Sequence, residues 1–210
     1  MISLRVRTCV TVAAAFAMVT LPLLNESASA CPFCSAPQLT LAEMIDQSDH
    51  LVLASWVQGT RPTSESAGSV DFMIVAVGRS QEDQLKTGQT LTLPFYVSGK
   101  EGEQFALMGP GTDYLNWQSP TKVTEESWEY IRDCPAPEKD PERRQKRLAW
   151  FLRFLEHPEL LVSNDAYGEF ASAKYETIRT LKDQMPRDEL RNWVGNAETP
   201  VTRVALYGMM

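Results

Sequence analysis

The hydrophobic pattern of this 210-residue chain changes its period near Thr124. Before that residue apolar side chains alternate with polar ones, as in Val70–Ala76, which is the period of a strand with one buried face. After it they recur at three- and four-residue spacing, as in Leu148–Leu155, which is the period of a helix. We therefore predict an α+β protein whose first half is rich in strands and whose second half is helical.

The first half contains five short apolar runs with turn residues between them. After a short helix at Leu39–Ser48, strands are expected at Leu51–Val57, Val70–Ala76, Leu91–Val97, Phe105–Met108 and Tyr114–Trp117. Pro94 lies inside the third run, so that strand must be an edge strand or carry a bulge. Short strands at this spacing predict a small antiparallel β-barrel of the OB type, or a sandwich.

The second half contains helical segments joined by short loops. Helices are expected at Thr124–Cys134, from Asp140 and Pro141 through Leu155, at Asp165–Ala171, Tyr175–Met185 and Pro186–Val194, and from Pro200 onward with Thr199 as cap. Such an arrangement is typical of a helical, repeat-like domain. The last segment is apolar, so it docks inward, forms an interface, or belongs to a truncated solenoid. We place the two modules at residues 31–135 and 136–210.

Residues 1–30 have the pattern of an export signal. Met1–Arg7 is basic, Cys9–Leu24 is largely apolar, and Ala28–Ala30 is a small-residue cleavage sequence. An uncleaved anchor would need about 20 apolar residues, and this run is shorter and broken by proline. We predict a periplasmic, cell-surface or extracellular protein with no membrane span after cleavage. Cleavage before Cys31 leaves one alternative, a lipoprotein anchored through that thiol.

Composition and motifs argue against several classes of function. Removal of the leader leaves 18 basic and 26 acidic residues, which disfavours nucleic acid as a partner. The histidines, His50 and His157, offer little imidazole for catalysis. The chain contains no G-x-S-x-G, H-E-x-x-H, P-loop or dinucleotide fingerprint. We predict an exported, non-enzymatic binding or interaction protein, without cofactor or metal, whose ligand is an unknown protein or cell-envelope component.

Three cysteines remain after cleavage: Cys31, Cys34 and Cys134. In an oxidising compartment they imply one disulfide and one thiol that is free, lipidated, metal-bound or shared with a second chain as a dimer. All three pairings are open. A Cys34–Cys134 bond would close a loop of about 100 residues and contribute a few kcal/mol.

The spacing Cys31-Pro32-Phe33-Cys34 supports an alternative function, a periplasmic thiol-disulfide redox protein. The usual context, a core strand before the motif and a helix after it, is missing here. A zinc site that adds His50 and Cys134 has suitable ligands but lacks the second closely spaced pair that would make it specific.

Two charged clusters and one glycine have structural explanations that need no functional role. Acidic residues at 125, 126, 129 and 133 and basic residues at 143, 144, 146 and 147 are expected on solvated helix faces. Gly168 lies inside a helical pattern, where it costs about 1 kcal/mol relative to alanine. Close packing of a neighbouring helix is the expected reason for that glycine.

The span from Cys31 to about Met108 resembles the netrin-like module of tissue inhibitors of metalloproteinases, a five-stranded OB-type barrel. The shared elements are a cysteine-rich mature N-terminus, apolar strands at Leu51–Val57 and Val70–Val77, and Phe105–Gly109 after a turn with glycine. In that family the first mature cysteine chelates a protease zinc through its free amine and carbonyl. The resemblance thus implies a second alternative, an inhibitor acting through Cys31. The mature chain also resembles uncharacterised secreted bacterial proteins with a similar cysteine-rich start and a helical tail.

Overall fold

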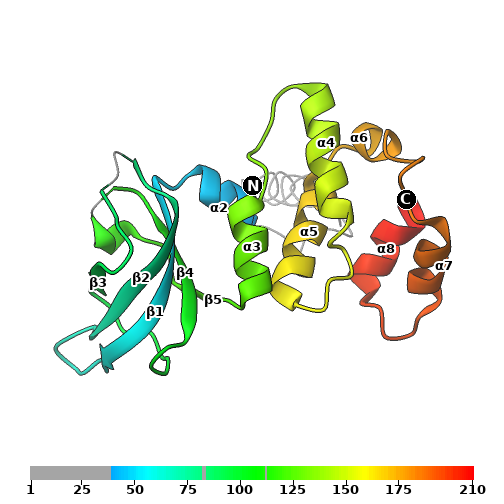
Figure 1. The fold of residues 1–210 in the computed structure, drawn as a ribbon. Helices are drawn as coiled ribbons and strands as arrows, with labels where there is room; N and C mark the ends of the chain where they lie inside the picture. The colour runs from blue at the N-terminus through cyan, green and yellow to red at the C-terminus, as the bar shows by residue number, and fades with distance from the viewer. Residues whose placement is uncertain (1–38, 82–83, 112) are drawn as a thin grey trace, which may run out of the picture. The chain divides into compact units, whose positions relative to one another are not determined.

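The computed structural model describes residues 39–81, 84–111 and 113–210. Within them the protein is α+β, with one five-stranded antiparallel sheet and seven α-helices (Figure 1). The strands are β1 (His50–Thr60), β2 (Ser69–Arg79), β3 (Thr90–Leu93), β4 (Gln104–Gly109) and β5 (Thr121–Lys122). The helices are α2 (Leu41–Asp46), α3 (Glu125–Asp133), α4 (Pro141–Leu152), α5 (Leu160–Ser172), α6 (Tyr175–Arg179), α7 (Arg187–Gly195) and α8 (Val201–Met209).

The strand order β3-β2-β1-β4-β5 contains a Greek key. Strands β1 to β3 form a meander, and β4 returns to pair with the free side of β1, for example Ala54 with Phe105. Among the described residues the sheet is open at β3 and β5, so the predicted closure into a barrel is not observed.

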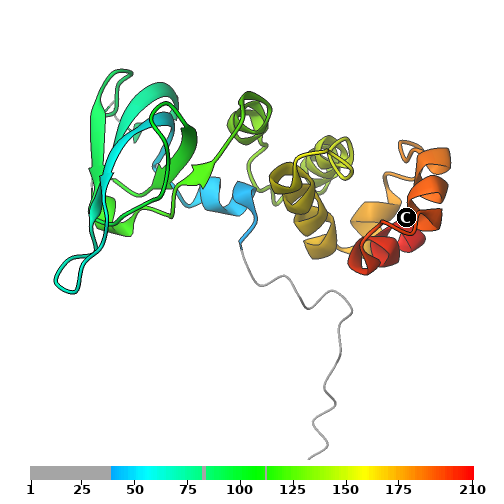
Figure 2. The ribbon, with the colours of Figure 1, turned by 90° about the horizontal axis from the view of Figure 1, so that it is seen from below.

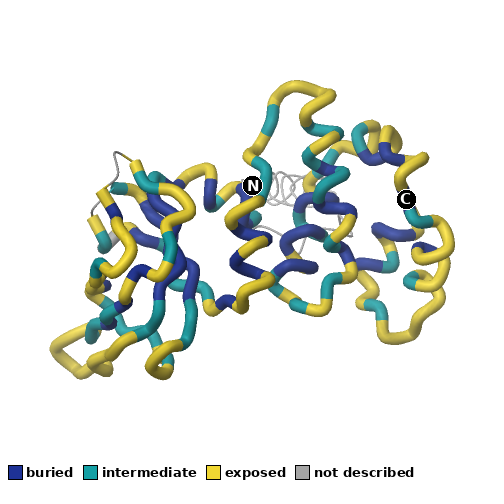
Figure 3. Tube along the Cα trace, viewed as in Figure 1, coloured by how far each residue is buried: buried dark blue, intermediate teal, exposed yellow. Residues whose placement is uncertain are grey.

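The main core cluster of the sheet lies on one face, and the side chains of Leu51, Leu53, Ala106 and Met108 are buried on the other face of β1 and β4. Register shifts between β1 and β2, such as the one between Leu53 and Ala54, are typical of bulges that increase strand twist and curl a sheet over its core. The buried side chains of this core are Val52, Ala54, Val70, Phe72, Ile74, Leu85, Leu91, Leu93, Phe105, Leu107 and Trp117. Figure 3 shows the same concentration of buried positions along the strands and of exposed ones at the loops.

Two predicted strands differ in the structure. The run Tyr114–Trp117 is not a strand, because Tyr114–Asn116 forms a 3₁₀ helix. In a strand, residues three apart point to opposite faces, whereas the 3₁₀ turn lets the rings of Tyr114 and Trp117 meet edge to face at 5.3 Å. Strand β3 ends at Leu93, because Pro94 has no N–H to donate.

Helix starts follow the predicted caps in part. Thr124 accepts a hydrogen bond from the backbone N–H of Ser127, and Asp140 accepts one from Arg143. Helix α5 begins at Leu160, five residues before the predicted start. Its first turn is apolar and no side chain caps it, so the sequence has no local signal for this start. Pro200, not Thr199, occupies the cap position of α8, and no side chain caps that helix.

The last helix packs inward. In both views α7 and α8 lie side by side (Figure 1, Figure 2), and Leu206 is fully buried. The buried Arg203 guanidinium donates to Leu155 O at 3.2 Å, Ser163 Oγ at 3.0 Å and Asn164 Oδ1 at 2.8 Å. The apolar end of the chain is therefore held by both packing and hydrogen bonds. No helix among the described residues is both long and apolar enough to cross a bilayer.

Candidate functional site

Helices α4 and α5 are joined by a buried ion pair between Arg147 and Glu169. These side chains are only 13% and 6% exposed. The Arg147 Nε–H also donates to the carbonyl of Pro135 at 3.1 Å, and the guanidinium lies 4.8 Å from the ring centre of Phe151. The prediction that Arg147 lies on a solvated face is wrong, because the residue is one helical turn before Phe151 and faces α5.

A second acid, Asp165, lies buried one turn before Glu169 on α5 and is 7% exposed. Its Oδ2 accepts a hydrogen bond from the Tyr130 hydroxyl at 2.7 Å, and its Oδ1 accepts one from the Leu41 N–H at 2.6 Å. This carboxyl therefore links α2, α3 and α5.

Burial is the largest influence on the pKa values of Asp165 and Tyr130. Loss of hydration raises the pKa of Asp165 to about 6, although the hydrogen bonds from Tyr130 and Leu41 act in the opposite direction. The charge of Glu169 adds to the rise, and that of Arg147 reduces it. Burial, and then the neighbouring Asp165, also raise the pKa of Tyr130. Tyr130 therefore remains a neutral hydrogen-bond donor at physiological pH.

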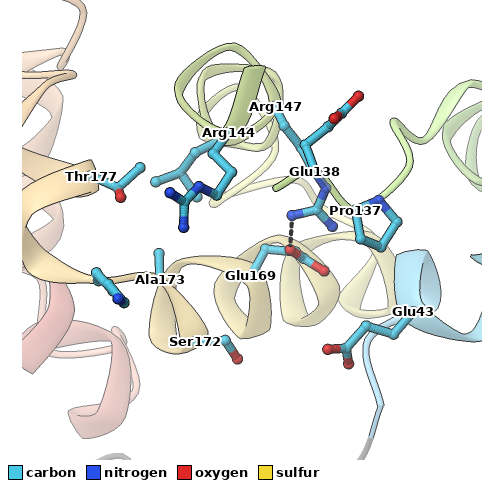
Figure 4. A pocket seen from close by; sticks show the side chains of 11 residues that line it. Glu43, Pro137, Glu138, Arg144, Arg147, Glu169, Ser172, Ala173 and Thr177 are labelled. Atoms are coloured by element: carbon cyan, nitrogen blue, oxygen red, sulfur yellow. Dashed lines mark hydrogen bonds and ion pairs between the residues drawn. The ribbon is translucent and has the colours of Figure 1, made fainter. Parts of the chain in front are cut away.

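A cavity of about 260 Å³ opens beside the Arg147–Glu169 pair (Figure 4). Its lining comes from α2, α4, α5, α6 and the segment before α4. The lining residues are Glu43, Pro137, Glu138, Arg144, Arg147, Leu148, Glu169, Ser172, Ala173, Lys174 and Thr177. We call it the α4–α5 cavity.

Arg144 is the one side chain of this lining that has a buried donor without a partner among the described residues. Its Nε atom is buried and makes no hydrogen bond. Figure 4 shows its guanidinium pointing from α4 toward Ala173. A solvated face was predicted for Arg144 as well, and that prediction is wrong, because Arg144 is one turn before the buried Leu148. Arg143 and Lys146, on the other side of the helix, are exposed as predicted.

The carboxylates that line the cavity already have other partners. Glu169 pairs with Arg147, Glu43 accepts the Thr40 N–H at 3.0 Å, and Glu138 lies 3.7 Å from Arg143. No carboxylate of the described residues pairs with Arg144. The cavity thus contains an arginine whose charge is available to a ligand.

Two of the predicted thiol sites, Cys31 and Cys34, lie outside the described residues. Cys134 lies half-buried at the end of α3. Burial, with a smaller contribution from Asp165, raises the pKa of its thiol. The thiol is therefore protonated at neutral pH, which suits a packed side chain better than a nucleophile.

The metal and acid-base candidates are not assembled into a site. His50 is fully buried in β1, its ring stacks on Trp117 with centres 5.9 Å apart, and its Nδ1 accepts a 3.4 Å hydrogen bond from Gln81. No three His, Cys, Asp or Glu side chains in the described part of the chain are arranged to hold a metal ion. The acidic residues at 125, 126, 129 and 133 are exposed on α3, as expected of a solvated face.

Sequence reasoning missed the two central polar groups, Asp165 and Arg144. The helical period indicates that both are buried. Arg144 is one turn before the buried Leu148. Asp165 and Glu169 are four residues apart, next to the apolar stripe of Val162 and Phe170 that faces the core. Polar residues at such positions indicate a buried network rather than a surface.

No protein-family model matches this chain, and no curated protein shows significant sequence similarity to it.

Proposed function

We propose that the chain is an exported, non-enzymatic binding protein for a component of the cell envelope, and that the α4–α5 cavity is its ligand site. The observation that carries the proposal is the guanidinium of Arg144, which lines the cavity and has no hydrogen-bond or ion-pair partner among the described residues. A negatively charged ligand would pair with its Nη–H groups, and such charge-assisted hydrogen bonds are about twice as strong as neutral ones.

The chemistry of the surrounding groups supports binding rather than catalysis. Both oxygens of Asp165 already accept hydrogen bonds, so this carboxyl is held in place rather than free to act as a base. The raised pKa of Cys134 argues against a thiolate nucleophile. The partners of the histidines are backbone N–H groups and, at 3.9 Å from His157, the exposed Glu126. Neither histidine is therefore paired with a serine, threonine or cysteine side chain among the described residues.

Two further features support the wider setting of the proposal. The basic and apolar pattern of residues 1–30 supports export. The Greek-key order of the sheet supports an OB-type, netrin-like module, since OB-folds are five-stranded Greek-key barrels. Such a module would support the helical half without contributing catalytic residues.

The test combines binding with turnover. The purified, exported chain is titrated with fractions of a cell-envelope extract, and the same sample is assayed against hydrolase and thiol-disulfide substrates. We expect saturable binding, weakened by Arg144→Gln but not by Lys146→Gln, and no turnover. Turnover that a single substitution abolishes, or the absence of saturable binding to every fraction, would contradict the proposal.

A further inference from the structure

We infer that the group recognised in the α4–α5 cavity is a single carboxylate, held by the Nη–H groups of Arg144. This inference rests on the proposed function and names its ligand class. Arginine is suited to the task because its planar guanidinium offers two parallel donors that match the two oxygens of a carboxylate. The Arg144 guanidinium lines the cavity and has no partner among the described residues.

The position of Arg144 is fixed by the start of α4. Its backbone N–H donates to Asp140 O at 2.9 Å, so the residue belongs to the first turn. The cap at Asp140 and the proline after it set where this turn begins. Leu148, one turn later, is buried and anchors the same helix face. The guanidinium is therefore presented from a rigid element, which is what specific recognition requires.

The charges of the lining select for a small negative charge. Glu43 and Glu138 lie around the same space, so a dianion would meet repulsion there. Arg147 and Glu169 match each other's charge, so this pair adds no net charge to the lining. Lys174 is exposed at the lining and adds one positive charge. One carboxylate is thus better matched than a phosphate dianion or a dicarboxylate.

The size and the remaining lining define the rest of the ligand. A cavity of about 260 Å³ lies just below the roughly 300–1,000 Å³ of typical small-molecule sites, so it suits a small ligand. Ala173 and Leu148 give an apolar wall, and the hydroxyls of Ser172 and Thr177 give polar positions. The site fits a short aliphatic acid or a small amino acid, which share the carboxylate.

The experiment is an NMR titration of the full chain at constant ionic strength. The probes are butanoate, alanine, succinate and inorganic phosphate, and the signals followed are the Arg144 side-chain Nε–H and the backbone amides of Ala173 and Thr177. Arg144→Lys assigns the Nε–H signal by removing it. We expect butanoate or alanine to shift all three signals saturably, and succinate and phosphate to bind at least several-fold more weakly.

The variants make the inference falsifiable. Arg144→Gln should weaken the favoured probe about tenfold or more, judged from the two amides. Arg144→Lys should weaken it several-fold, because an ammonium keeps the charge but lacks the planar edge. Lys146→Gln, an exposed charge on the same helix, should change affinity by less than twofold. Circular dichroism checks that each variant is folded.

Two results would overturn the carboxylate inference. One is an Arg144 Nε–H signal that no carboxylate moves, which would mean that water alone satisfies the group. The other is equal or stronger binding of phosphate. Envelope-fraction binding that persists in either case leaves the proposed function standing, whereas loss of all saturable binding removes both.

Discussion

The Tyr130 hydroxyl donates a 2.7 Å hydrogen bond to Oδ2 of Asp165, and the two residues thereby join α3 to α5. The other oxygen of Asp165 accepts the N–H of Leu41 at the start of α2. Three helices that are far apart in the sequence are thus joined through one buried carboxyl. The stability of the helical half should therefore depend on the protonation of Asp165.

The first prediction concerns pH. Because the pKa of Asp165 is raised from 3.8 to about 6 on folding, the folded state retains a proton that the unfolded state loses between these values. The contribution of this group to the free energy of unfolding is therefore greatest below pH 4, falls as pH rises toward 6, and is constant above that. The fall is up to about 3 kcal/mol for a shift of about two units.

Asp165→Asn isolates this effect, since an amide does not titrate. Its Oδ1 can still accept from Leu41, and its N–H can donate to Tyr130 with the hydroxyl as acceptor. Urea denaturation at pH 4, 5, 6 and 7 should show stability of the wild type, relative to the variant, declining toward pH 6. A difference that is constant over this range would contradict the assignment.

A second prediction follows from removing the hydroxyl of Tyr130. The hydrogen bond from Tyr130 lowers the pKa of Asp165, so Tyr130→Phe should raise that pKa further. The variant should also lose about 1–3 kcal/mol at pH 7, because a buried carboxylate oxygen loses its donor. Carboxyl ¹³C NMR titration measures the pKa, and an unchanged or lower value would refute the prediction.

Gly168 gives a third prediction, one that increases stability. The sequence predicts close packing there, but a Cβ at this position meets only the Thr40 methyl, at an ordinary contact of 3.4 Å. Gly168→Ala should therefore stabilise α5 by up to about 1 kcal/mol. Gly109→Ala is the contrasting control, since its Cβ would lie 2.3 Å from the Trp117 ring. Thermal denaturation that shows both variants destabilised to a similar extent would argue against this account of Gly168.

A fourth prediction concerns the attachment of α8. Arg203→Ala removes the donor to Ser163, Asn164 and the carbonyl of Leu155, and should cost about 3 kcal/mol or more. Arg191→Ala serves as the control, because its ion pair with Asp188 is exposed and such pairs contribute about 0–1 kcal/mol. If the two variants unfold at the same denaturant concentration, α8 is not held by this network.

The sequence predicted the main elements of the fold wherever local chemistry decides the structure. Thr124 and Asp140 carry side chains that cap a helix on their own, so α3 and α4 begin where expected. The start of α5 was missed because Leu160 follows no capping side chain and is set by packing. The aromatic composition of Tyr114–Trp117 favours a strand, whereas its conformation is set by the core contact of Trp117.

The candidate site was predicted less well for a related reason. A run of basic residues such as 143–147 suggests one exposed face. The helical period instead places Arg144 and Arg147 on the inner side of α4, and Arg143 and Lys146 on the outer side. Extending the apolar stripe of Leu148 and Phe151 back by one turn identifies both arginines. Which partner each one meets depends on the packing of α5 against α4, which no local pattern specifies.

The most direct test of the central claim is a crystal structure of the chain grown with butanoate or alanine. We expect the ligand to lie in the α4–α5 cavity with its two carboxylate oxygens about 3 Å from the two Nη atoms of Arg144. The Arg147–Glu169 pair should remain intact beside it. A ligand bound elsewhere, or water alone beside the Arg144 guanidinium at saturating concentration, would contradict the claim.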